Sequence, residues 1–527
     1  MHEPKHNSRR QYGGRIGLGA AIQFAGVIAQ QVLRFGSNWL IAHLFGPGVI
    51  GLLNLSLTSW SSVEMSFSGG LIRAIMRYLP HHLARGERAE AKGVARVAMY
   101  TAWIGGGVLA LLMYLLADVI AIYILRKPET APLLRILALL MPVAATSSVI
   151  WATARALGSF MFIVYQFIVV PAIFVLCIGA ISLLRGDGRL LAWGYLLSYL
   201  LPLIPLLSYH RRLMRTLGDV APRLLARPFL SFAGIGALMW LAEFTARNID
   251  LVLVGRMGTL AEAGVYGIAT RNATLCSTVM ISINAFFMPT ISSLYSAGRM
   301  DDFRELFRKG TLWILIVGAP LIVYAMAFSE PMMLFFGRSF GIGAWALWLL
   351  ALAQLFNQGT GLIASALLMA NRQHSVLLVN VLGLGVTFGL CLLLIPIYGL
   401  NGAAMAMAAS VVFVNLTLCL WGYFTMRLSP LSGSYFKPII ASAAAGIISQ
   451  IAVAHLPIGT LQQAAGGHVG KVMLTLLAGL VIFVPLYVLG MLALGAKDEG
   501  LKALQAVRSG LNRRNQAIAD AKEVDGI

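Results

Sequence analysis

Apolar and polar residues follow one another along this chain in long blocks, without the short alternation of a soluble fold. Fourteen apolar stretches of roughly 20 residues occur between residues 17 and 495, and each is long enough to cross a bilayer as a helix. The pattern predicts an all-α polytopic membrane protein with about 14 transmembrane helices. Because the first apolar run is too long for a signal peptide and has no small-residue cleavage site, we expect an uncleaved first helix.

Composition agrees with this class and places the chain across a membrane. Of 527 residues, 59% are hydrophobic and 11% are charged, and the mean hydropathy is +0.81, which excludes a soluble globular domain. The net charge of +20 does not indicate a nucleic-acid partner, because the basic residues are concentrated in segments on one predicted side of the membrane. With both termini inside, cytoplasmic segments hold 27 Lys and Arg and outside loops hold seven, so we expect cytoplasmic termini.

The second half of the chain repeats the first. Matched positions lie 212 or 213 residues apart: Arg34 and Arg247, Gly51 and Gly264, and Gly86 and Gly298. In each half an Arg-bearing helix, a short outside turn, a long returning helix and a charged surface loop follow in order. An even number of helices per repeat makes the halves parallel. The repeat predicts two pseudo-symmetric six-helix bundles plus two extra C-terminal helices.

These patterns predict six segments. They are a cytoplasmic basic tail (1–16), an N-terminal six-helix bundle (17–210), a cytoplasmic basic linker (211–228), a C-terminal six-helix bundle (229–428), helices 13 and 14 (429–496) and a second cytoplasmic basic tail (497–527).

The apolar stretch 229–254 carries three charges inside it. Glu243, Arg247 and Asp250 are spaced by four and three residues, so they share one helix face. Charges at this depth are costly and normally pair with one another or line a water-filled cavity. Two interpretations stay open on these residues alone: an ion cluster that locks two helices together, or a site for a charged cargo.

Further ionisable residues lie deep in other apolar stretches. Arg34, Arg73 and Arg271 are candidate ligands for an anion, together with Arg247. Glu64, Glu243 and Asp250 are candidate sites for a coupling ion, either H⁺ or Na⁺, with Glu243 the first choice. The competing interpretation for Glu243 is a static pair with Arg247, one turn away.

The sequence contains no motif typical of an enzyme or of a cofactor site. Gly470-Lys471 lacks the glycine five residues ahead that a phosphate loop needs, so ATP is not expected as the direct energy source. The longest outside loop contains no acid, which disfavours a glycosyltransferase or ligase. Neither a His-rich metal cluster nor a Cys pair at ligand spacing occurs. We expect a non-enzyme without metal or cofactor.

Three segments resemble a known family. FGSNWLIAHLFGPGVIGLLNLS, RAIMRYLPHHLARGERAEA and RNIDLVLVGRMGTLAEAGVYGIATRN are similar to the polysaccharide-transporter (oligosaccharide flippase) branch of the multidrug/oligosaccharidyl-lipid/polysaccharide (MOP) flippase superfamily. The resemblance implies a cationic cavity among helices 1, 2, 7 and 8, and a cargo of undecaprenyl-pyrophosphate-linked oligosaccharide moved from the cytoplasmic to the periplasmic leaflet. It also implies a bacterial inner membrane, membrane lipids and polysaccharide polymerase machinery as partners.

The first hypothesis is a flippase for such a glycan, for O-antigen, capsule or exopolysaccharide, working by alternating access. The alternatives are a multidrug or cation antiporter, a lipid II flippase, and a membrane enzyme of glycan assembly. Lipid II flippases usually have an acid in the first outside turn, where this chain has Gly48-Val49-Ile50-Gly51.

The sharpest prediction concerns the pyrophosphate. Arg34 and Arg247 are expected to face each other and hold it, with Arg73 and Arg271 guiding the headgroup or contacting acidic sugars. In the alternative, Arg247 is satisfied by Glu243 and Asp250 while Arg34 bonds nearby polar side chains.

Overall fold

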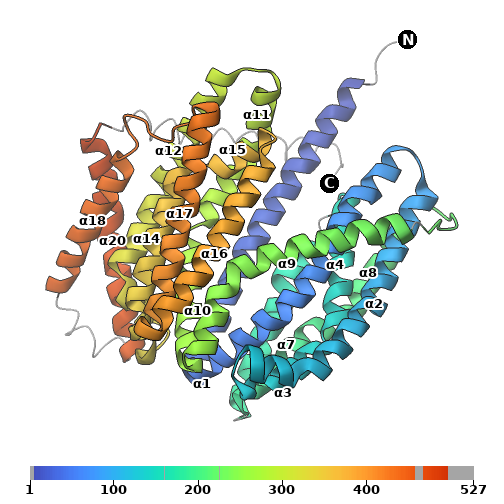
Figure 1. Ribbon diagram of the computed structural model, residues 1–527, viewed down its shortest axis with the longest axis horizontal. Helices are drawn as coiled ribbons and strands as arrows, with labels where there is room; N and C mark the ends of the chain where they lie inside the picture. Colours follow the sequence, from blue (N-terminus) through green and yellow to red (C-terminus); the bar gives the residue numbers. More distant parts are fainter. Residues whose placement is uncertain (1–4, 160, 185, 225, 457–466, 496–527) are drawn as a thin grey trace, which may run out of the picture. The chain divides into compact units, whose positions relative to one another are not determined.

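Every regular element in the described part of the chain is a helix, so the predicted all-α class is confirmed (Figure 1). The computed structural model describes residues 5–159, 161–184, 186–224, 226–456 and 467–495. The predicted C-terminal basic tail, 497–527, lies outside these ranges. The longer helices are α1 (Lys5–Ala84), α2 (Arg88–Val119), α3 (Ala131–Ala138), α4 (Met141–Ala156), α6 (Val170–Leu183), α7 (Leu191–Leu200), α8 (Leu203–Arg215), α9 (Ala226–Met257), α10 (Leu260–Leu275), α11 (Thr278–Ser296), α12 (Met300–Ala327), α14 (Ala344–Thr360), α16 (Gln373–Tyr398), α17 (Leu400–Met426), α18 (Lys437–His455) and α20 (His468–Ala493).

Shorter helical segments connect them. They are η1 (Ile120–Ile124), η2 (Pro128–Thr130), α5 (Met161–Val164), η3 (Tyr165–Val169), η4 (Gly188–Leu190), α13 (Ser329–Leu334), η5 (Arg338–Gly343) and α15 (Ile363–Met369). Helix α1 begins at Lys5, so most of the segment predicted as a cytoplasmic tail is helical.

Eleven helices of the described ranges are long and apolar enough to cross a membrane, or up to twelve if the bent pair Pro128–Ala138 and Met141–Ala156 is one span. One of them, Gly26–Ala84, covers most of the first predicted stretch (17–42) and all of the second (49–77), and the helical geometry breaks between the two at Gly46 (φ 80°, ψ 178°). Another of the fourteen apolar stretches, residues 264–295, is predicted as one helix but is divided between α10 and α11. The chain is a multi-pass membrane protein.

The helices form two compact units. Among the described residues, unit 1 contains the chain up to Phe45 and Leu52–Asn248, and unit 2 contains Gly46–Gly51 and the chain from Ile249 onward. Two helices therefore contribute to both units: α1 supplies Gly46–Gly51 to unit 2, and α9 passes from unit 1 to unit 2 after Asn248. The six-helix bundles predicted at 17–210 and 229–428 stay a prediction.

Small residues set the helix packing of unit 1. Helix α2 lies against α3 and α4, and its Ala98 and Ala102 share a fully buried cluster with Ala145 and Ala152 of α4. In a bilayer the surrounding lipid is as apolar as a leucine side chain, so close contact between small side chains is a main source of helix association.

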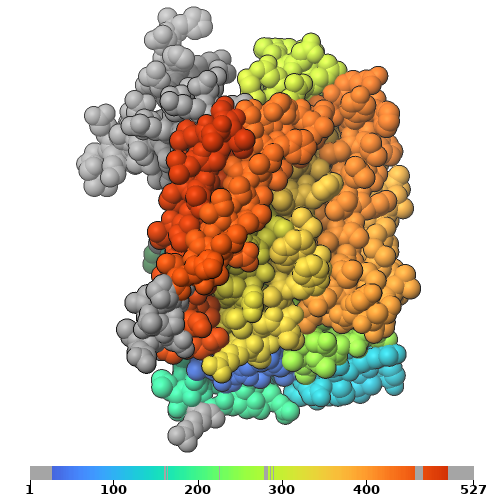
Figure 2. All heavy atoms as spheres, turned by 90° about the vertical axis from the view of Figure 1, so that its left-hand side faces the viewer, coloured from blue at the N-terminus to red at the C-terminus, as the bar shows by residue number. Residues whose placement is uncertain are grey.

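Helices α12, α14, α16 and α17 form the centre of unit 2, and the pair α18 and α20 lies beside α12. Figure 2 shows α18 and α20 as a ridge next to α14 on one face of this unit. The hydroxyl of Tyr324 on α12 donates to the Leu476 carbonyl (2.5 Å), and the hydroxyl of Tyr487 on α20 donates to the Ile316 carbonyl (2.7 Å). The C-terminal pair is thus hydrogen-bonded to the bundle.

The two charged surface loops of the repeat have the same backbone. Gly86 and Gly298 have φ values of 76° and 70°, a region in which glycine has no steric penalty. Each glycine N–H donates to the carbonyl three residues earlier (3.0 Å), and its carbonyl accepts from the N–H two residues later (2.9 Å). The following residues, Glu87 (φ −80°, ψ 70°) and Arg299 (φ −81°, ψ 68°), match as well. The internal repeat seen in the sequence is therefore a structural repeat at these loops.

A second matched pair of glycines meets inside unit 2. A methyl group at Gly51 would overlap the Leu260 carbonyl, and one at Gly264 would overlap the Pro47 carbonyl. Both positions therefore need glycine so that the two matched segments of the repeat can pack backbone to backbone.

Candidate functional site

Helix α9 carries the charged residues around which the candidate site is built. Its first part lies against the returning half of α1 within unit 1, and glycines make the approach close. A methyl group at Gly70 would overlap the Ala233 carbonyl, and one at Gly69 would overlap the indole of Trp240. This packing places the side chain of Arg73 over α9.

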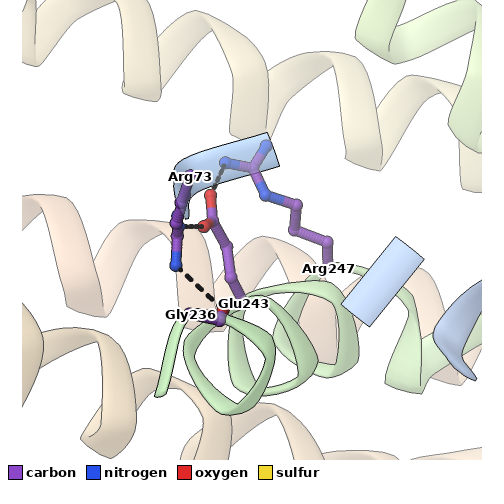
Figure 3. Close-up of polar contacts among 4 residues, drawn as sticks. All are labelled: Arg73, Gly236, Glu243 and Arg247. Atoms are coloured by element: carbon purple, nitrogen blue, oxygen red, sulfur yellow. Dashed lines mark hydrogen bonds and ion pairs between the residues drawn. The ribbon is translucent and has the colours of Figure 1, made fainter. Parts of the chain in front are cut away.

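Arg73 is held on α9 by three different contacts, of which Figure 3 shows those with Gly236 and Glu243. Its Nη1 donates to the carbonyl oxygen of Gly236 (3.2 Å), and its guanidinium carbon lies 5.4 Å from the centre of the Trp240 ring. Its Nη2 lies 3.5 Å from Oε2 of Glu243. A backbone acceptor, an aromatic face and a carboxylate together fix the orientation of this guanidinium.

Glu243 shares its two oxygens between two arginines. Oε2 faces Arg73, while Oε1 accepts from Nη2 of Arg247 at 3.0 Å (Figure 3). We call Arg73, Glu243 and Arg247 the arginine pair group. Two guanidinium charges with one carboxylate leave a net charge of +1.

The exposure of the three side chains differs. Arg73 is 32% exposed and Glu243 is 43% exposed, whereas Arg247 is 74% exposed. The pair between Glu243 and Arg247 is therefore screened by solvent and weak. An anion can approach Arg247 without first displacing a buried contact.

The acids of the predicted face have separate environments. Glu243 is half-exposed in unit 1, whereas Asp250 is fully buried in unit 2, where its Oδ2 accepts from the Tyr266 hydroxyl at 2.6 Å. No ion pair reaches Asp250 within the described ranges. The sequence-based alternative in which Arg247 is held by both acids thus holds for Glu243 alone.

Glu64 is a second buried carboxylate. It lies on α1 in unit 1, and Oε1 accepts from the hydroxyl of Ser68, one turn later, at 2.6 Å. Tyr199 of α7 interacts electrostatically with both Glu64 and Arg34. Like Asp250, Glu64 has a hydroxyl donor and no ion pair in the described chain.

Arg34 and Arg271 lie outside the arginine pair group. Both are exposed, Arg34 on α1 and Arg271 on α10. The structure brings Arg73 and Arg247 together through Glu243, and the face-to-face arrangement of Arg34 and Arg247 stays a prediction.

Sequence reasoning missed three participants: Gly236, Trp240 and Tyr266. A signal for Trp240 was available, because Trp240, Glu243 and Arg247 follow at spacings of three and four and so share a helix face. Gly236 acts through its carbonyl, which no sequence pattern marks. Within the described ranges, no three His, Cys, Asp or Glu side chains converge as metal ligands would.

Solved structures of known transporters share the fold of this chain. The lipid II flippase MurJ in an inward closed conformation aligns with a TM-score of 0.66 at 13% identity, over 90% of this chain and 99% of that one. An inward-facing multidrug resistance MATE family transporter of the MOP superfamily also aligns with a TM-score of 0.66 at 13% identity, over 75% of this chain and 94% of that one. The fold is that of a MOP-superfamily transporter.

A family model narrows the class. The model described as "Polysaccharide biosynthesis protein" matches residues 79–342, half of the chain, and the chain belongs to this family. The resemblance to the polysaccharide-transporter branch that the sequence indicated is thereby confirmed.

Two curated proteins are similar to this chain in sequence. The succinoglycan biosynthesis transport protein ExoT of Rhizobium meliloti is 25% identical over 470 residues, which cover 84% of this chain and 89% of ExoT. The probable flippase AglR of Haloferax volcanii is 23% identical over 214 residues, which cover 40% of this chain and 44% of AglR. The match to AglR thus spans less than half of that protein.

Proposed function

We propose that this protein is a flippase of polysaccharide biosynthesis. Its cargo is an oligosaccharide linked to undecaprenyl pyrophosphate, which it moves from the cytoplasmic to the periplasmic leaflet of a bacterial inner membrane by alternating access. The family membership and the names of ExoT and AglR support transport in glycan assembly. The observation that carries the proposal is the arginine pair group on membrane-spanning helices.

The charge of the arginine pair group suits a pyrophosphate. Two guanidinium groups share one carboxylate, so each has N–H donors left for a further anion. A pyrophosphate brings two or more negative charges, and planar guanidinium groups meet its oxygens with paired, charge-assisted hydrogen bonds. Arg73 is pre-oriented by Gly236 and Trp240, and Arg247 is open to solvent. Net positive charge at this depth is costly unless an anion is to be bound there.

The remaining arginines complete the proposed path. Arg34, exposed on α1, is proposed to contact the pyrophosphate together with Arg247, and Arg271 to contact acidic sugars or the headgroup. Because arginine keeps its charge in any protein environment, these contacts attract the anion at every working pH.

Ion coupling is proposed at the two buried acids. Glu64 and Asp250 are held by hydroxyl groups and have no arginine partner among the described residues, so each can take up a proton or Na⁺ without breaking an ion pair. Glu243 is a weaker candidate, because its charge is already used by two arginines.

The buried acids also favour a second function, antiport of cationic drugs. The fold does not decide, because the flippase and the multidrug transporter structures align equally well. The net positive charge of the arginine pair group supports the flippase, because it would repel a cationic drug.

Deletion of the gene tests the proposal. A strain without the protein should accumulate lipid-linked oligosaccharide in the cytoplasmic leaflet and lose surface glycan, and the cloned gene should restore both. A strain that keeps its glycan and becomes sensitive to cationic drugs would instead establish the antiporter.

A further inference from the structure

The loop that joins α8 to α9 is fastened to the start of α2. Nζ of Lys92 donates to the carbonyl oxygens of Gly218 and Val220, both at 3.1 Å. The N–H of Arg223 donates to the Ala89 carbonyl (3.0 Å). Gly93 makes this docking possible, since a methyl group there would overlap the Arg223 carbonyl. Three hydrogen bonds and one close backbone approach within unit 1 thus hold a loop that contains no part of the arginine pair group.

A cavity of about 390 Å³ lies where the loop meets α2 and α8. It is lined by Lys92, Met214, Arg215, Gly218 and Asp219. Its volume is within the range of small-molecule sites. The loop contributes Gly218 and Asp219 to the lining, and Gly218, with φ 90°, accepts the hydrogen bond from Lys92.

The lining is suited to a single negative charge. Lys92 spends two of its three N–H donors on the loop and has one left. Arg215 is exposed at the end of α8, and the guanidinium of Arg88 lies beside Gly218. The lining thus holds two cations, with Arg88 next to it, and one carboxylate, Asp219. Asp219 can accept a hydrogen bond from a hydroxyl of the ligand but repels a second negative charge.

Helix α8 indicates where the rest of the ligand lies. Its exposed face runs through Ile204, Ser208, Arg211 and Arg215, at spacings of four, three and four residues. Ile204 is 75% exposed, as expected for a lipid contact. Along this face the side chains change from apolar through hydroxyl to cationic as the cavity is approached. A phospholipid changes in the same order from acyl chain through glycerol to phosphate.

We propose that this cavity binds the headgroup of an anionic glycerophospholipid of the phosphatidylglycerol type. The phosphodiester contacts Lys92, Arg215 and Arg88, the terminal hydroxyls donate to Asp219, and the acyl chains follow the exposed face of α8. Basic pockets at helix ends are established sites for anionic headgroups in membrane proteins. The site is separate from the cargo site and independent of the proposed function.

The test is lipid binding to the full-length protein purified in detergent. Titration with palmitoyl-oleoyl phosphatidylglycerol, followed by native mass spectrometry, should show a saturable bound lipid, and phosphatidylcholine should not compete. Arg215→Gln should weaken binding about fivefold, because each basic residue near an anionic lipid contributes about 1 kcal/mol to the binding free energy. The double variant, Arg215→Gln with Arg88→Gln, should bind phosphatidylglycerol still more weakly than Arg215→Gln alone.

The matched control is Arg308→Gln, which removes an exposed arginine from the start of α12. It should bind phosphatidylglycerol as the unchanged protein does. Equal loss in this control would mean that net charge alone attracts the lipid, and the proposal would fail.

Two further probes identify the ligand. Inorganic phosphate should not displace the lipid at millimolar concentration; if it does so fully, the site binds a free anion and the lipid assignment is wrong. Asp219→Asn should reduce the preference for phosphatidylglycerol over phosphatidic acid, because the acceptor for the headgroup hydroxyls is weakened and a second negative charge is tolerated. An unchanged preference would contradict the proposed orientation.

Discussion

Arg73 and Arg247 differ in how firmly their guanidinium groups are held, so their substitutions should differ. Arg73→Lys loses the planar group that meets the Gly236 carbonyl, the Trp240 ring and Glu243 at once. Charge-assisted hydrogen bonds contribute about 1.5 to 3 kcal/mol, so we expect glycan export to fall about tenfold or more. Arg247→Lys, at an exposed side chain, should reduce export less, and Arg247→Ala more.

Export is measured at matched membrane abundance of each variant. The control is Arg77→Lys on the same helix, whose guanidinium lies over the Phe232 ring at 4.5 Å and has no carboxylate partner in the described ranges. If Arg73→Lys and Arg247→Ala both export at the normal rate, the arginine pair group does not bind the cargo.

Glu243 competes with the cargo for the same two guanidinium groups. Glu243→Gln keeps the shape and one acceptor but removes the charge, so an anionic cargo should bind more tightly and leave more slowly. We expect a lower apparent KM together with a lower maximal rate, measured with lipid-linked oligosaccharide in proteoliposomes. If the only role of Glu243 were to pair helices, the variant would lose thermal stability while both kinetic constants of the surviving protein stayed normal.

Glu64 and Asp250 should carry the ion dependence of transport. Glu64→Gln and Asp250→Asn keep an acceptor for Ser68 and Tyr266 but cannot gain or lose a proton. At least one of them should make transport independent of the proton or sodium gradient, as measured in proteoliposomes with and without each gradient. Transport that responds normally to both gradients in the double variant would remove these acids from the mechanism.

At the scale of elements, the contact between α1 and α9 depends on residues that have no side chain. Gly70→Ala places a methyl group against the Ala233 carbonyl, and overpacking of this kind costs about 1 to 3 kcal/mol. We expect a lower apparent Tm and reduced export, because Arg73 is displaced from Glu243. Gly234→Ala is the matched control on α9, since nothing lies within 4 Å of its new methyl group and alanine favours a helix. Equal Tm values for the two variants would show that this contact does not hold the helices.

At the scale of the whole molecule, the distribution of basic residues predicts the topology. Single cysteines at Arg85 and Arg308, in a variant without the native cysteines, should react with an impermeant maleimide only after the cytoplasmic side is exposed. Cysteines at Glu129 and Ser339 should react in intact cells once the outer membrane is permeable. All four positions are exposed. The reverse labelling pattern would invert the proposed direction of transport.

The elements of this protein follow from one-dimensional properties of its sequence. An apolar run of about 20 residues is long enough to cross a bilayer as a helix. Because a helix forms its backbone hydrogen bonds within itself, such spans can be predicted without knowledge of their neighbours. The repeat can also be found from the spacing of residues in the sequence alone, and the matched backbones at Gly86 and Gly298 confirm it at those loops. The glycines Gly51 and Gly264 were matched by spacing, although their mutual contact was not predicted.

The candidate site was only partly predictable, because its partners are set by packing distances between segments far apart in the chain. Glu243, Arg247 and Asp250 share one face of an ideal helix, yet Asp250 is buried against Tyr266 while Glu243 stays half-exposed. Arg73 meets Gly236 across 163 residues because glycines let α1 and α9 approach closely. The sequence by itself determined the spans, the charge asymmetry and the set of ionisable residues within the membrane. Only the tertiary structure decided which arginines share a carboxylate, since that depends on contacts between helices rather than on the spacing within one.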